Sequence, residues 1–505
     1  MTAGGQTAAA PAASEQAAGG HVVVVGGGLA GLSAACRLAA EGRRVTLLES
    51  RSRLGGATFS FERDGLIVDN GQHVLLRCYA EYRAFLDLIG VGDQIDLQPR
   101  FHIPVVTADG RRAELSRNGL PAPLHLAATL SRYRLLSAVD RAKVLFAAGL
   151  LRTLKPADPA LDERSFGDWL AAHGQSAAAI AALWNLITVA ALNTDADHAS
   201  LALCAMVFRT ALLERADAAD IGVPRLPLGQ LHGEAAATFL SKRGATVSLR
   251  TPVREIRRSA DGWSVATDTD TVTADAVVVA TTPEPAATIL PADALAEPAR
   301  LGGLGSAPIV NVHVVYNRTV TRSPFTAVVD SPVQWVFDRT AIGGAPVGGQ
   351  YLAVSLSAAG AWIDEPTARL REVFVPELAR LFPEATRAEV LSFFVTRERR
   401  ATFRQTPGSG RLRPPAVTRL PGCVLAGAWT ATGWPDTMEG AVRSGNEAAR
   451  IVGAYLAHGV GAASNRVDNP VVDQQHGLIV DNRAASSRDG GSRAGSATGT
   501  AGATS

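Results

Sequence analysis

The chain has 505 residues, of which 47% are hydrophobic, and its 49 Lys or Arg residues nearly balance its 47 Asp or Glu residues. The length suggests about three domains, or two larger interleaved ones. A net charge of +2 gives no whole-chain field that would attract nucleic acid, and no basic patch with interleaved aromatic residues occurs, so we expect no nucleic-acid partner.

The N-terminal residues 1–20 are rich in Ala and Gly and contain no Lys or Arg, so they lack the positive segment of a secretory signal. We expect them to form a disordered leader, and we expect residues 460–505 to form a disordered tail. No apolar run approaches the roughly 20 residues that a membrane span needs. These features predict a cytoplasmic protein, either soluble or peripheral on the inner face of the cytoplasmic membrane.

A predicted strand over residues 22–25 runs into a G-x-G-x-x-G turn formed by Gly26, Gly28 and Gly31, and a helical pattern follows. The first glycine permits a tight turn, the second lets a pyrophosphate approach the backbone, and the third lets the helix pack closely on the sheet. The phosphates would lie at the helix N-terminus, where free N–H groups favour anions. The segment therefore predicts a dinucleotide cofactor.

A second predicted strand, over residues 45–48, ends at Glu49, and 49 − 31 places this acid 18 residues after the last glycine. An acid at about that offset accepts hydrogen bonds from ribose hydroxyls. Arg51, Gly55 and Gly56 follow, as expected where a second loop closes over a pyrophosphate, which favours FAD over a nicotinamide cofactor. Only one G-x-G-x-x-G occurs, so no NADPH fold is predicted and the electron donor stays open.

Nine Lys or Arg residues lie between residues 111 and 155, against Glu114 and Asp140, and Leu, Val and Phe are interleaved with them. A basic amphipathic face of this kind either lies on anionic lipid or forms a solvated helix face whose apolar side belongs to the core. The sequence leaves both interpretations open.

Periodicity predicts the remaining elements. Residues 81–221 are mostly helical by pattern, and a further helix covers 231–243. Strand patterns cover 247–256, 262–267 and 275–280, and residues 291–414 combine strands at 309–316 and 351–356 with a helix at 367–381. Near the C-terminus a strand, a loop containing Gly427 and a helix starting near Met438 supply a second backbone donor site.

The pairing of these N- and C-terminal signatures resembles the flavin-dependent amine oxidase and carotenoid desaturase superfamily. Within it, residues 66–79, LIVDNGQHVLLRCY, are similar to the squalene-associated flavoproteins of bacterial hopanoid synthesis, the hydroxysqualene dehydroxylase family. The resemblance covers residues 21–456. It implies an α/β fold in which the Rossmann-type FAD-binding domain is discontinuous and the substrate domain is mixed α+β. The FAD-binding domain would comprise residues 21–80, 222–290 and 415–456, and the substrate domain would comprise residues 81–221 and 291–414.

The same resemblance implies that reduced FAD delivers a hydride to hydroxysqualene, which loses its allylic hydroxyl and becomes squalene. A hydrophobic isoprenoid of this kind calls for an apolar tunnel. Met438 would cap the isoalloxazine side of FAD, and Val253 either contacts adenine through its backbone or is an ordinary buried strand residue. Ala57 and the pair Ala428-Trp429 stand where the family often has polar flavin contacts, so those two contacts are in doubt.

Cleavage of the C–O bond needs a general acid, because hydroxide is a poor leaving group. His73 and Asp436 are the candidate catalytic residues, and Asp69 and Glu439 are further acids in the same motifs. His73 is otherwise a hydrogen-bonded structural residue, Asp436 a helix N-cap, Asp69 a turn cap and Glu439 a first-turn acid favoured by the helix dipole.

Metal and nucleophile sites are not predicted, because the ten His residues form no i, i+4 pair, the four Cys residues form no C-x-x-C pair, and no G-x-S-x-G occurs. The scattered cysteines fit a reducing compartment. The alternatives to a dehydroxylase are a carotenoid or other isoprenoid desaturase or isomerase, an amine oxidase, and a non-catalytic FAD-binding scaffold for isoprenoid enzymes.

Overall fold

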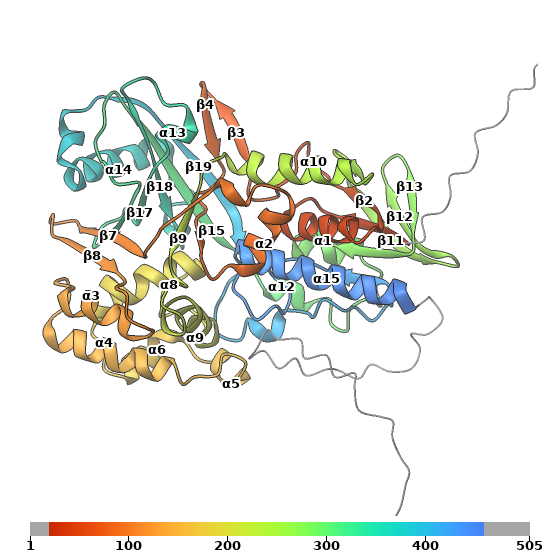
Figure 1. The fold of residues 1–505 in the computed structure, drawn as a ribbon, viewed down its shortest axis with the longest axis horizontal. Coiled ribbons are helices and arrows are strands. Elements are labelled where there is room, and N and C mark those ends of the chain that lie inside the picture. The colour runs from red at the N-terminus through yellow and green to blue at the C-terminus, as the bar shows by residue number, and fades with distance from the viewer. Residues whose placement is uncertain (1–19, 459–505) are drawn as a thin grey trace, which may run out of the picture. The chain divides into compact units, whose positions relative to one another are not determined.

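A five-stranded parallel sheet organises both ends of the chain in the computed structural model, which describes residues 20–458 (Figure 1). The sheet has the order β10-β2-β1-β14-β20 and takes its strands from segments far apart in the sequence. The strands are β1 (His21–Val25), β2 (Arg44–Leu48), β10 (Thr246–Ser248), β14 (Ala276–Val279) and β20 (Cys423–Leu425). Apart from Gly20, the predicted leader lies outside the described residues, as does the predicted tail.

Both faces of this sheet are covered, which explains why β1 is a run of four valines rather than an alternating pattern. Val22 and Val24 pack with helices α1 (Leu29–Ala40) and α15 (Met438–His458). Val23 and Val25 pack on the other side with a three-stranded antiparallel sheet, which consists of β11 (Val253–Ser259), β12 (Gly262–Thr267) and β13 (Thr271–Ala274). The predicted strands and helix starts around the cofactor motifs are therefore confirmed, whereas the predicted domain boundaries stay a prediction.

A second, mixed sheet has seven strands in the order β19-β15-β18-β17-β16-β7-β8. The predicted strands at 309–316 and 351–356 and the helix at 367–381 are confirmed within it and beside it. Its strands are β7 (His102–Thr107), β8 (Arg112–Ser116), β15 (Ala307–Tyr316), β16 (Phe325–Val329), β17 (Trp335–Asp338), β18 (Gln350–Leu356) and β19 (Val390–Thr402), and α14 (Thr367–Leu381) packs on it.

The prediction for residues 81–221 needs a correction, because β7 and β8 interrupt the helical segment and join the second sheet. β7 pairs in parallel with β16, whose residues lie more than 200 positions later, so no local turn signal marks the pairing. A smaller antiparallel sheet adds β5 (Leu75–Leu76), β6 (Ile95–Leu97) and β9 (Ile221–Pro224).

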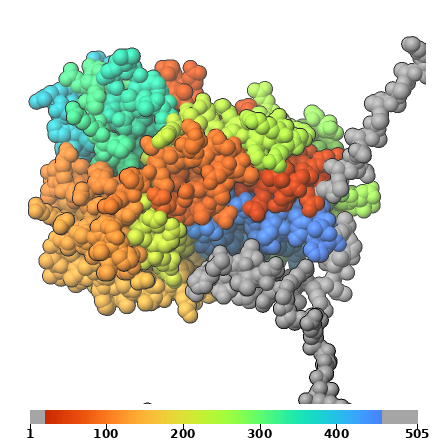
Figure 2. All heavy atoms as spheres, in the orientation of Figure 1, coloured from red at the N-terminus to blue at the C-terminus, as the bar shows by residue number. Residues whose placement is uncertain are grey.

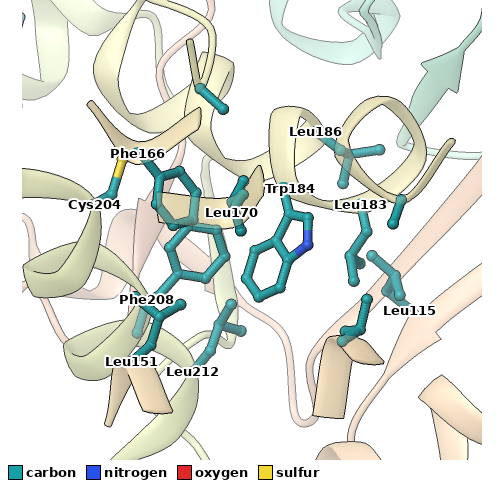
Figure 3. Close-up of a cluster of buried hydrophobic side chains, with 14 of the residues drawn as sticks. Leu115, Leu151, Phe166, Leu170, Leu183, Trp184, Leu186, Cys204, Phe208 and Leu212 are labelled. Atoms are coloured by element: carbon teal, nitrogen blue, oxygen red, sulfur yellow. The ribbon is translucent and has the colours of Figure 1, made fainter. Parts of the chain in front are cut away.

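The rest of residues 81–221 is helical, as predicted. The helices before β9 are α2 (Ala80–Leu88), α3 (Ala127–Arg132), α4 (Ala138–Leu151), α5 (Pro159–Asp162), α6 (Phe166–Ala172), α7 (Ala177–Ala179), α8 (Asn185–Leu192) and α9 (Leu201–Phe208). Two π-helical segments, η3 (Ile180–Trp184) and η4 (Arg209–Leu213), extend α7 and α9. Figure 3 shows their shared core, where the ring centroids of Trp184 and Phe208 lie 5.1 Å apart.

The chain returns from this helical segment to the first sheet through a third π-helical segment, η5 (Gly229–Glu234), and α10 (Ala235–Lys242). The predicted helix over 231–243 is thereby confirmed in outline. The shorter helices α11 (Pro283–Ile289), α12 (Arg300–Gly303) and α13 (Thr340–Gly343) complete the described part of the chain.

A buried ion pair joins the cofactor motifs to the second sheet. Asp69, at the end of β4 (Leu66–Asp69), accepts a hydrogen bond from the guanidinium group of Arg339, which follows β17. The pair is buried on both sides, with side-chain exposures of 2% for Asp69 and 8% for Arg339. The other oxygen of Asp69 accepts from Ser60, in β3 (Ser60–Arg63), and from the Leu228 amide. Asp69 therefore fixes three segments at one point.

Helices α1 and α15 run side by side with their backbones in close contact (Figure 1). A Cβ atom at Gly445 would overlap the carbonyl oxygen of Ala30, and Ser33 donates hydrogen bonds to Asn446 and to the Val442 carbonyl. The absence of a side chain at Gly445 is what lets the last helix pack against the first.

We expect Gly445→Ala to lower the free energy of unfolding by about 1–3 kcal/mol, because the added methyl group must push α15 away from α1. Gly453→Ala, in the same helix, is the matched control. Its Cβ would lie 3.4 Å from a carboxylate oxygen of Glu41, so it should leave stability unchanged or raise it by up to about 1 kcal/mol. Urea unfolding measures both, and equal stability of the two variants would contradict the role of this contact.

Candidate cofactor and active site

The glycine turn after β1 has the shape that a pyrophosphate site requires. Gly26 has a φ of +107°, and a Cβ atom there would lie 2.6 Å from the Ala280 carbonyl oxygen. At Gly31 a Cβ atom would overlap the carbonyl oxygen of Gly26. Gly28 differs from both, since a Cβ atom there would meet only Gly56, at 3.8 Å. Among residues 20–458, no atom closes the space above Gly28 and no side chain caps the first turn of α1.

Glu49 is buried at the end of β2 and ties the glycine turn to the strand. One carboxylate oxygen accepts a hydrogen bond from the Gly27 amide at 2.6 Å. The other oxygen accepts from the Arg51 amide at 2.7 Å and from the hydroxyl of Ser50. The carboxylate thus lies at the carboxyl edge of the sheet, next to the turn whose N–H groups would bind phosphate.

The second glycine pair closes over the first turn. The Gly55 amide donates to the Gly27 carbonyl at 2.8 Å, and Gly28 and Gly55 form a parallel bridge. A Cβ atom at Gly56 would lie 2.8 Å from Cα of Gly28, so a side chain at residue 56 would collide with the turn. The glycines and Glu49 predicted as cofactor-binding residues are therefore brought together.

Arg51 and Val253 lie at the outer end of the same edge. The Arg51 side chain is exposed, and its carbonyl accepts from the Arg250 amide at 2.9 Å. The Thr251 amide donates to the Glu49 carbonyl at 2.8 Å, and Val253, the first residue of β11, comes two residues after Thr251. Val253 is half-buried, and its pairing register with β12 shifts immediately after it.

The C-terminal half of the site joins the glycine turn through β14. Gly427 follows β20 with a φ of +150°, and its amide donates to Ser444 in α15 at 2.8 Å. The indole of Trp429 donates to the Thr281 carbonyl at 2.9 Å, one residue after the Ala280 carbonyl that faces Gly26. Met438 is buried at the start of α15. These contacts place the predicted residues Gly427 and Met438 on the segments that flank the turn.

Two of the four candidate acids hold structural positions. Asp69 is taken up by the ion pair with Arg339 described above. Glu439 is fully buried in the first turn of α15 and accepts from the Tyr82 amide at 2.8 Å and from the Arg443 guanidinium at 2.7 Å. Since the Glu81 amide also donates to it, Glu439 caps the N-terminus of α2.

Asp436 lies in a different environment, in the loop before α15. One of its oxygens, Oδ2, accepts from the Phe403 amide at 2.9 Å, whereas Oδ1 makes no hydrogen bond with any described residue. Burial raises the pKa of Asp436 to about 6, against the opposing effects of that hydrogen bond and of the Arg413 charge. The Asp436 amide donates to Gln405, so the loop is fixed while one carboxyl oxygen stays available.

His73 is half-buried, and its Nδ1 lies 3.1 Å from the Gly71 carbonyl oxygen. Because a carbonyl oxygen only accepts, Nδ1 carries the proton in this contact and Nε2 of the neutral ring does not. Burial lowers the pKa of His73, although the Gly71 hydrogen bond and the Asp69 charge oppose the shift. Neutral His73 can accept a proton at Nε2 but has none to donate from that atom.

Sequence reasoning did not single out two further polar residues of this region. Gln72 lies in the predicted motif, yet both polar atoms of its amide are buried without a partner among residues 20–458. His232, in η5, lies 2.6 Å from the hydroxyl of Tyr82, and burial together with the nearby His73 lowers its pKa to about 3. His232 lies in a π-helical segment, a geometry that is frequent at functional sites. The sequence does not reveal a π-helix, so it gave no reason to single out His232.

These observations are the test of whether the residues fit FAD. The turn at Gly26, Gly28 and Gly31 leaves N–H groups and open space at a helix N-terminus, a buried carboxylate ends β2, and an unpaired amide at Gln72 lies in the adjoining motif. The residues fit. Among the described residues, no group of three or more His, Cys, Asp or Glu side chains could hold a metal ion, and all four cysteines are free.

We expect Glu49→Ala to weaken FAD retention at least tenfold, because the amides of Gly27 and Arg51 lose their acceptor and the turn loses its shape. Glu41→Ala, an acid at the end of α1 with 42% side-chain exposure, is the control. The ratio of flavin to protein absorbance after exhaustive dialysis measures retention, and the thermal midpoint of each apoprotein separates cofactor loss from unfolding. Full flavin occupancy in dialysed Glu49→Ala would contradict the assignment.

Comparison with known proteins agrees with this geometry. The sequence profile described as flavin containing amine oxidoreductase matches residues 29–453. A hydroxysqualene dehydroxylase of Sinorhizobium fredii is 31% identical over 84% of this chain and 96% of its own length. A zeta-carotene desaturase of Zea mays is 26% identical over 85% of this chain and 82% of its own length.

The fold also matches a solved structure, the cyclohexylamine oxidase of Brevibacterium oxydans, with a TM-score of 0.66 at 19% identity over 87% of this chain and 99% of that one. The discontinuous Rossmann-type arrangement and the mixed second sheet are thereby confirmed. The cofactor is FAD, and the chain is an oxidoreductase. The chain belongs to the flavin containing amine oxidoreductase family.

Proposed function

We propose that the chain removes the allylic hydroxyl group of hydroxysqualene to give squalene. The observation that carries this proposal is the 31% identity to a hydroxysqualene dehydroxylase over nearly the full length of that relative, against 26% to a zeta-carotene desaturase. Bound reduced FAD supplies the hydride that replaces the hydroxyl group. The C–O bond breaks, the oxygen leaves as water with one added proton, and the carbon gains the hydride.

Backbone groups are proposed to hold most of the cofactor. Gly26, Gly28 and Gly31 form the pyrophosphate cradle, Gly55 and Gly56 close over it, and Glu49 with Arg51 lies at the ribose end. The Val253 backbone would contact adenine, and Gly427 and Met438 would contact the isoalloxazine end. Because these contacts are largely main-chain, the loss of polar side chains at Ala57, Ala428 and Trp429 leaves the cradle intact.

Asp436 is proposed as the general acid. A hydroxyl group leaves as water only if it receives a proton, and the donor must be neutral before the reaction. Asp436 combines a raised pKa of about 6 with a carboxyl oxygen that has no hydrogen-bond partner among the described residues. His73 is proposed as a hydrogen-bond acceptor, since its Nε2 lacks a proton, and it would hold the substrate hydroxyl or a water molecule in position.

The substrate is a hydrophobic isoprenoid, and the helical segment has an apolar pocket whose lining suits part of a hydrocarbon chain, as described below. Within the described residues, no helix is long and apolar enough to cross a membrane. We propose that the protein acts in the cytoplasm, at the inner face of the cytoplasmic membrane, where its substrate is dissolved. Its four unpaired cysteines agree with a reducing compartment.

Anaerobic mixing tests the reaction. The purified protein is reduced with light and then supplied with hydroxysqualene dispersed in detergent. Reoxidation of FAD together with an equal amount of squalene, measured by absorbance and mass spectrometry, supports the proposal.

Two results would overturn it. Consumption of zeta-carotene or phytoene by the oxidised protein, without turnover of hydroxysqualene, would indicate a desaturase. Stable reduced FAD in the presence of every isoprenoid alcohol would indicate a non-catalytic FAD-binding scaffold.

The dehydroxylation rate should depend on pH through Asp436. The folded-state pKa is raised, so the neutral, proton-donating form predominates below pH 6 and is lost as pH rises. We expect the single-turnover rate to be constant below about pH 6 and to fall about tenfold per pH unit above it.

Asp436→Asn keeps an acceptor for the Phe403 amide but has no proton to donate, so its rate should fall at least about a hundredfold while FAD stays bound. Asp293→Asn, at an exposed acid, is the control. A pH-independent rate, or full activity of Asp436→Asn, would exclude Asp436 as the acid.

A further inference from the structure

The segment from residue 118 to residue 155 exposes an unusual number of large apolar side chains. Of the eleven large hydrophobic side chains that are strongly exposed among the described residues, five lie in this segment. We call these five the docking face, and their exposures are 50% for Leu120, 55% for Leu124, 63% for Val139, 44% for Leu145 and 63% for Phe146. Scattered exposed apolar residues need no explanation, but a gathering of this kind does.

Helix α4 carries most of the docking face because it has two apolar sides. Val144, Ala147 and Leu151 point into the core and are almost completely buried. Val139 and Phe146, seven residues apart, lie on the same side of the helix and face outward. A surface helix of a globular protein has one apolar stripe. The second stripe of α4 has no partner among residues 20–458.

The charges around the docking face are almost all positive. Between residues 118 and 155 the chain has six Lys or Arg residues and a single acid, Asp140. None of the six makes an ion pair with a described residue, and Asp140 accepts from Ser137 at 2.6 Å. The six are Arg132, Arg134, Arg141, Lys143, Arg152 and Lys155. Figure 2 shows this part of the chain, in orange, on the surface of the molecule. Apolar side chains ringed by cations complement an anionic lipid surface.

A pocket of about 170 Å³ opens between α3 and α4, next to the docking face. Leu124 and Leu145 belong both to the pocket wall and to the docking face. The pocket continues inward to Trp184, Phe208 and Leu212, and Figure 3 shows these side chains in the core below. Its lining is apolar except for Thr129 and Arg152.

The inner wall of the pocket is built by the two π-helical segments of this region. Leu183 and Trp184 come from η3, and Leu212 and Leu213 come from η4. The wider π turn costs helix stability, and such turns are frequent at functional sites. The irregular geometry therefore coincides with the pocket.

We propose that the docking face lies on an anionic lipid bilayer, with the pocket mouth toward the acyl chains, so that an isoprenoid enters the protein without crossing water. The loop before α3 and the outer side of α4 would rest among the lipid headgroups, and the six cations would contact their phosphates. The identity of the entering molecule rests on the proposed function, whereas the docking itself does not.

Vesicle binding by the FAD-loaded protein tests the docking face. We use neutral phosphatidylcholine vesicles and vesicles in which about a third of the lipid is phosphatidylglycerol, at low and high salt. The protein should cosediment with the anionic vesicles, and neutral lipid or high salt should weaken the binding at least tenfold. Failure to bind anionic vesicles would overturn the proposal.

Two sets of variants locate the contact. Val139→Ser/Phe146→Ser and Arg134→Gln/Lys143→Gln should each reduce vesicle binding about tenfold or more. The matched controls, Val347→Ser/Leu391→Ser and Arg318→Gln/Arg322→Gln, change exposed residues elsewhere and should bind as the unchanged protein does. All of these side chains lie outside the pocket wall and the cofactor site, so flavin occupancy should be equal. Equal vesicle binding by variants and controls would overturn the proposal.

A last comparison separates this proposal from the proposed function. With hydroxysqualene in detergent, Val139→Ser/Phe146→Ser should turn over normally, and with hydroxysqualene in anionic vesicles it should be at least about tenfold slower. If the unchanged protein binds vesicles but turns over no hydroxysqualene in either medium, the proposed function is disproved and the proposed docking face is not. The unchanged protein could instead self-associate without binding vesicles, and Val139→Ser/Phe146→Ser could abolish that self-association. The docking face would then be a contact between copies of the chain, and the proposal would be overturned.

Discussion

The close contact between α1 and α15 is the constraint on which the rest of the structure depends. Two helices can approach this closely only where a side chain is missing, and Gly445 against Ala30 provides that place. The contact joins the first described helix of the chain to the last, and together with the pairing of β20 to β1 through β14 it brings the loop after β20 beside the glycine turn. This packing positions the backbone groups that are proposed to hold the cofactor, because main-chain donors are placed by the elements that carry them.

Burial assigns different tasks to acids with the same chemistry. Asp69 is neutralised by Arg339, and Glu439 is satisfied by a helix terminus and Arg443, so both stabilise the fold. Asp436 receives a single amide hydrogen bond and keeps one oxygen free. The environment that makes a carboxyl group costly to ionise is also the one that lets it keep a proton near neutral pH.

The sequence pattern predicted those parts of the fold that depend on residues close together in the chain. The valines of β1, the glycine turn and Glu49 lie within 30 residues of one another, and their arrangement was predicted correctly. Arg339, which pairs with Asp69, and the Tyr82 amide, which donates to Glu439, lie 270 and 357 residues away from those acids, so no spacing rule reveals these two contacts. The parallel pairing of β7 with β16 was missed for the same reason. On α4 the interpretation of an apolar side in the core is confirmed by Val144, while contact of the outward side, which carries Phe146, with anionic lipid stays a prediction.

The buried pair of Asp69 and Arg339 has a consequence for how a large molecule gets in. Separating the two charges would leave each one unpaired in a dry interior, at a cost of about 3–5 kcal/mol. The pair therefore opposes any motion that would separate the segment after β17 from the end of β4. A hinge motion that broke the pair would have to supply this free energy in every catalytic cycle, whereas entry of a hydrocarbon by a route that leaves the pair intact avoids the cost.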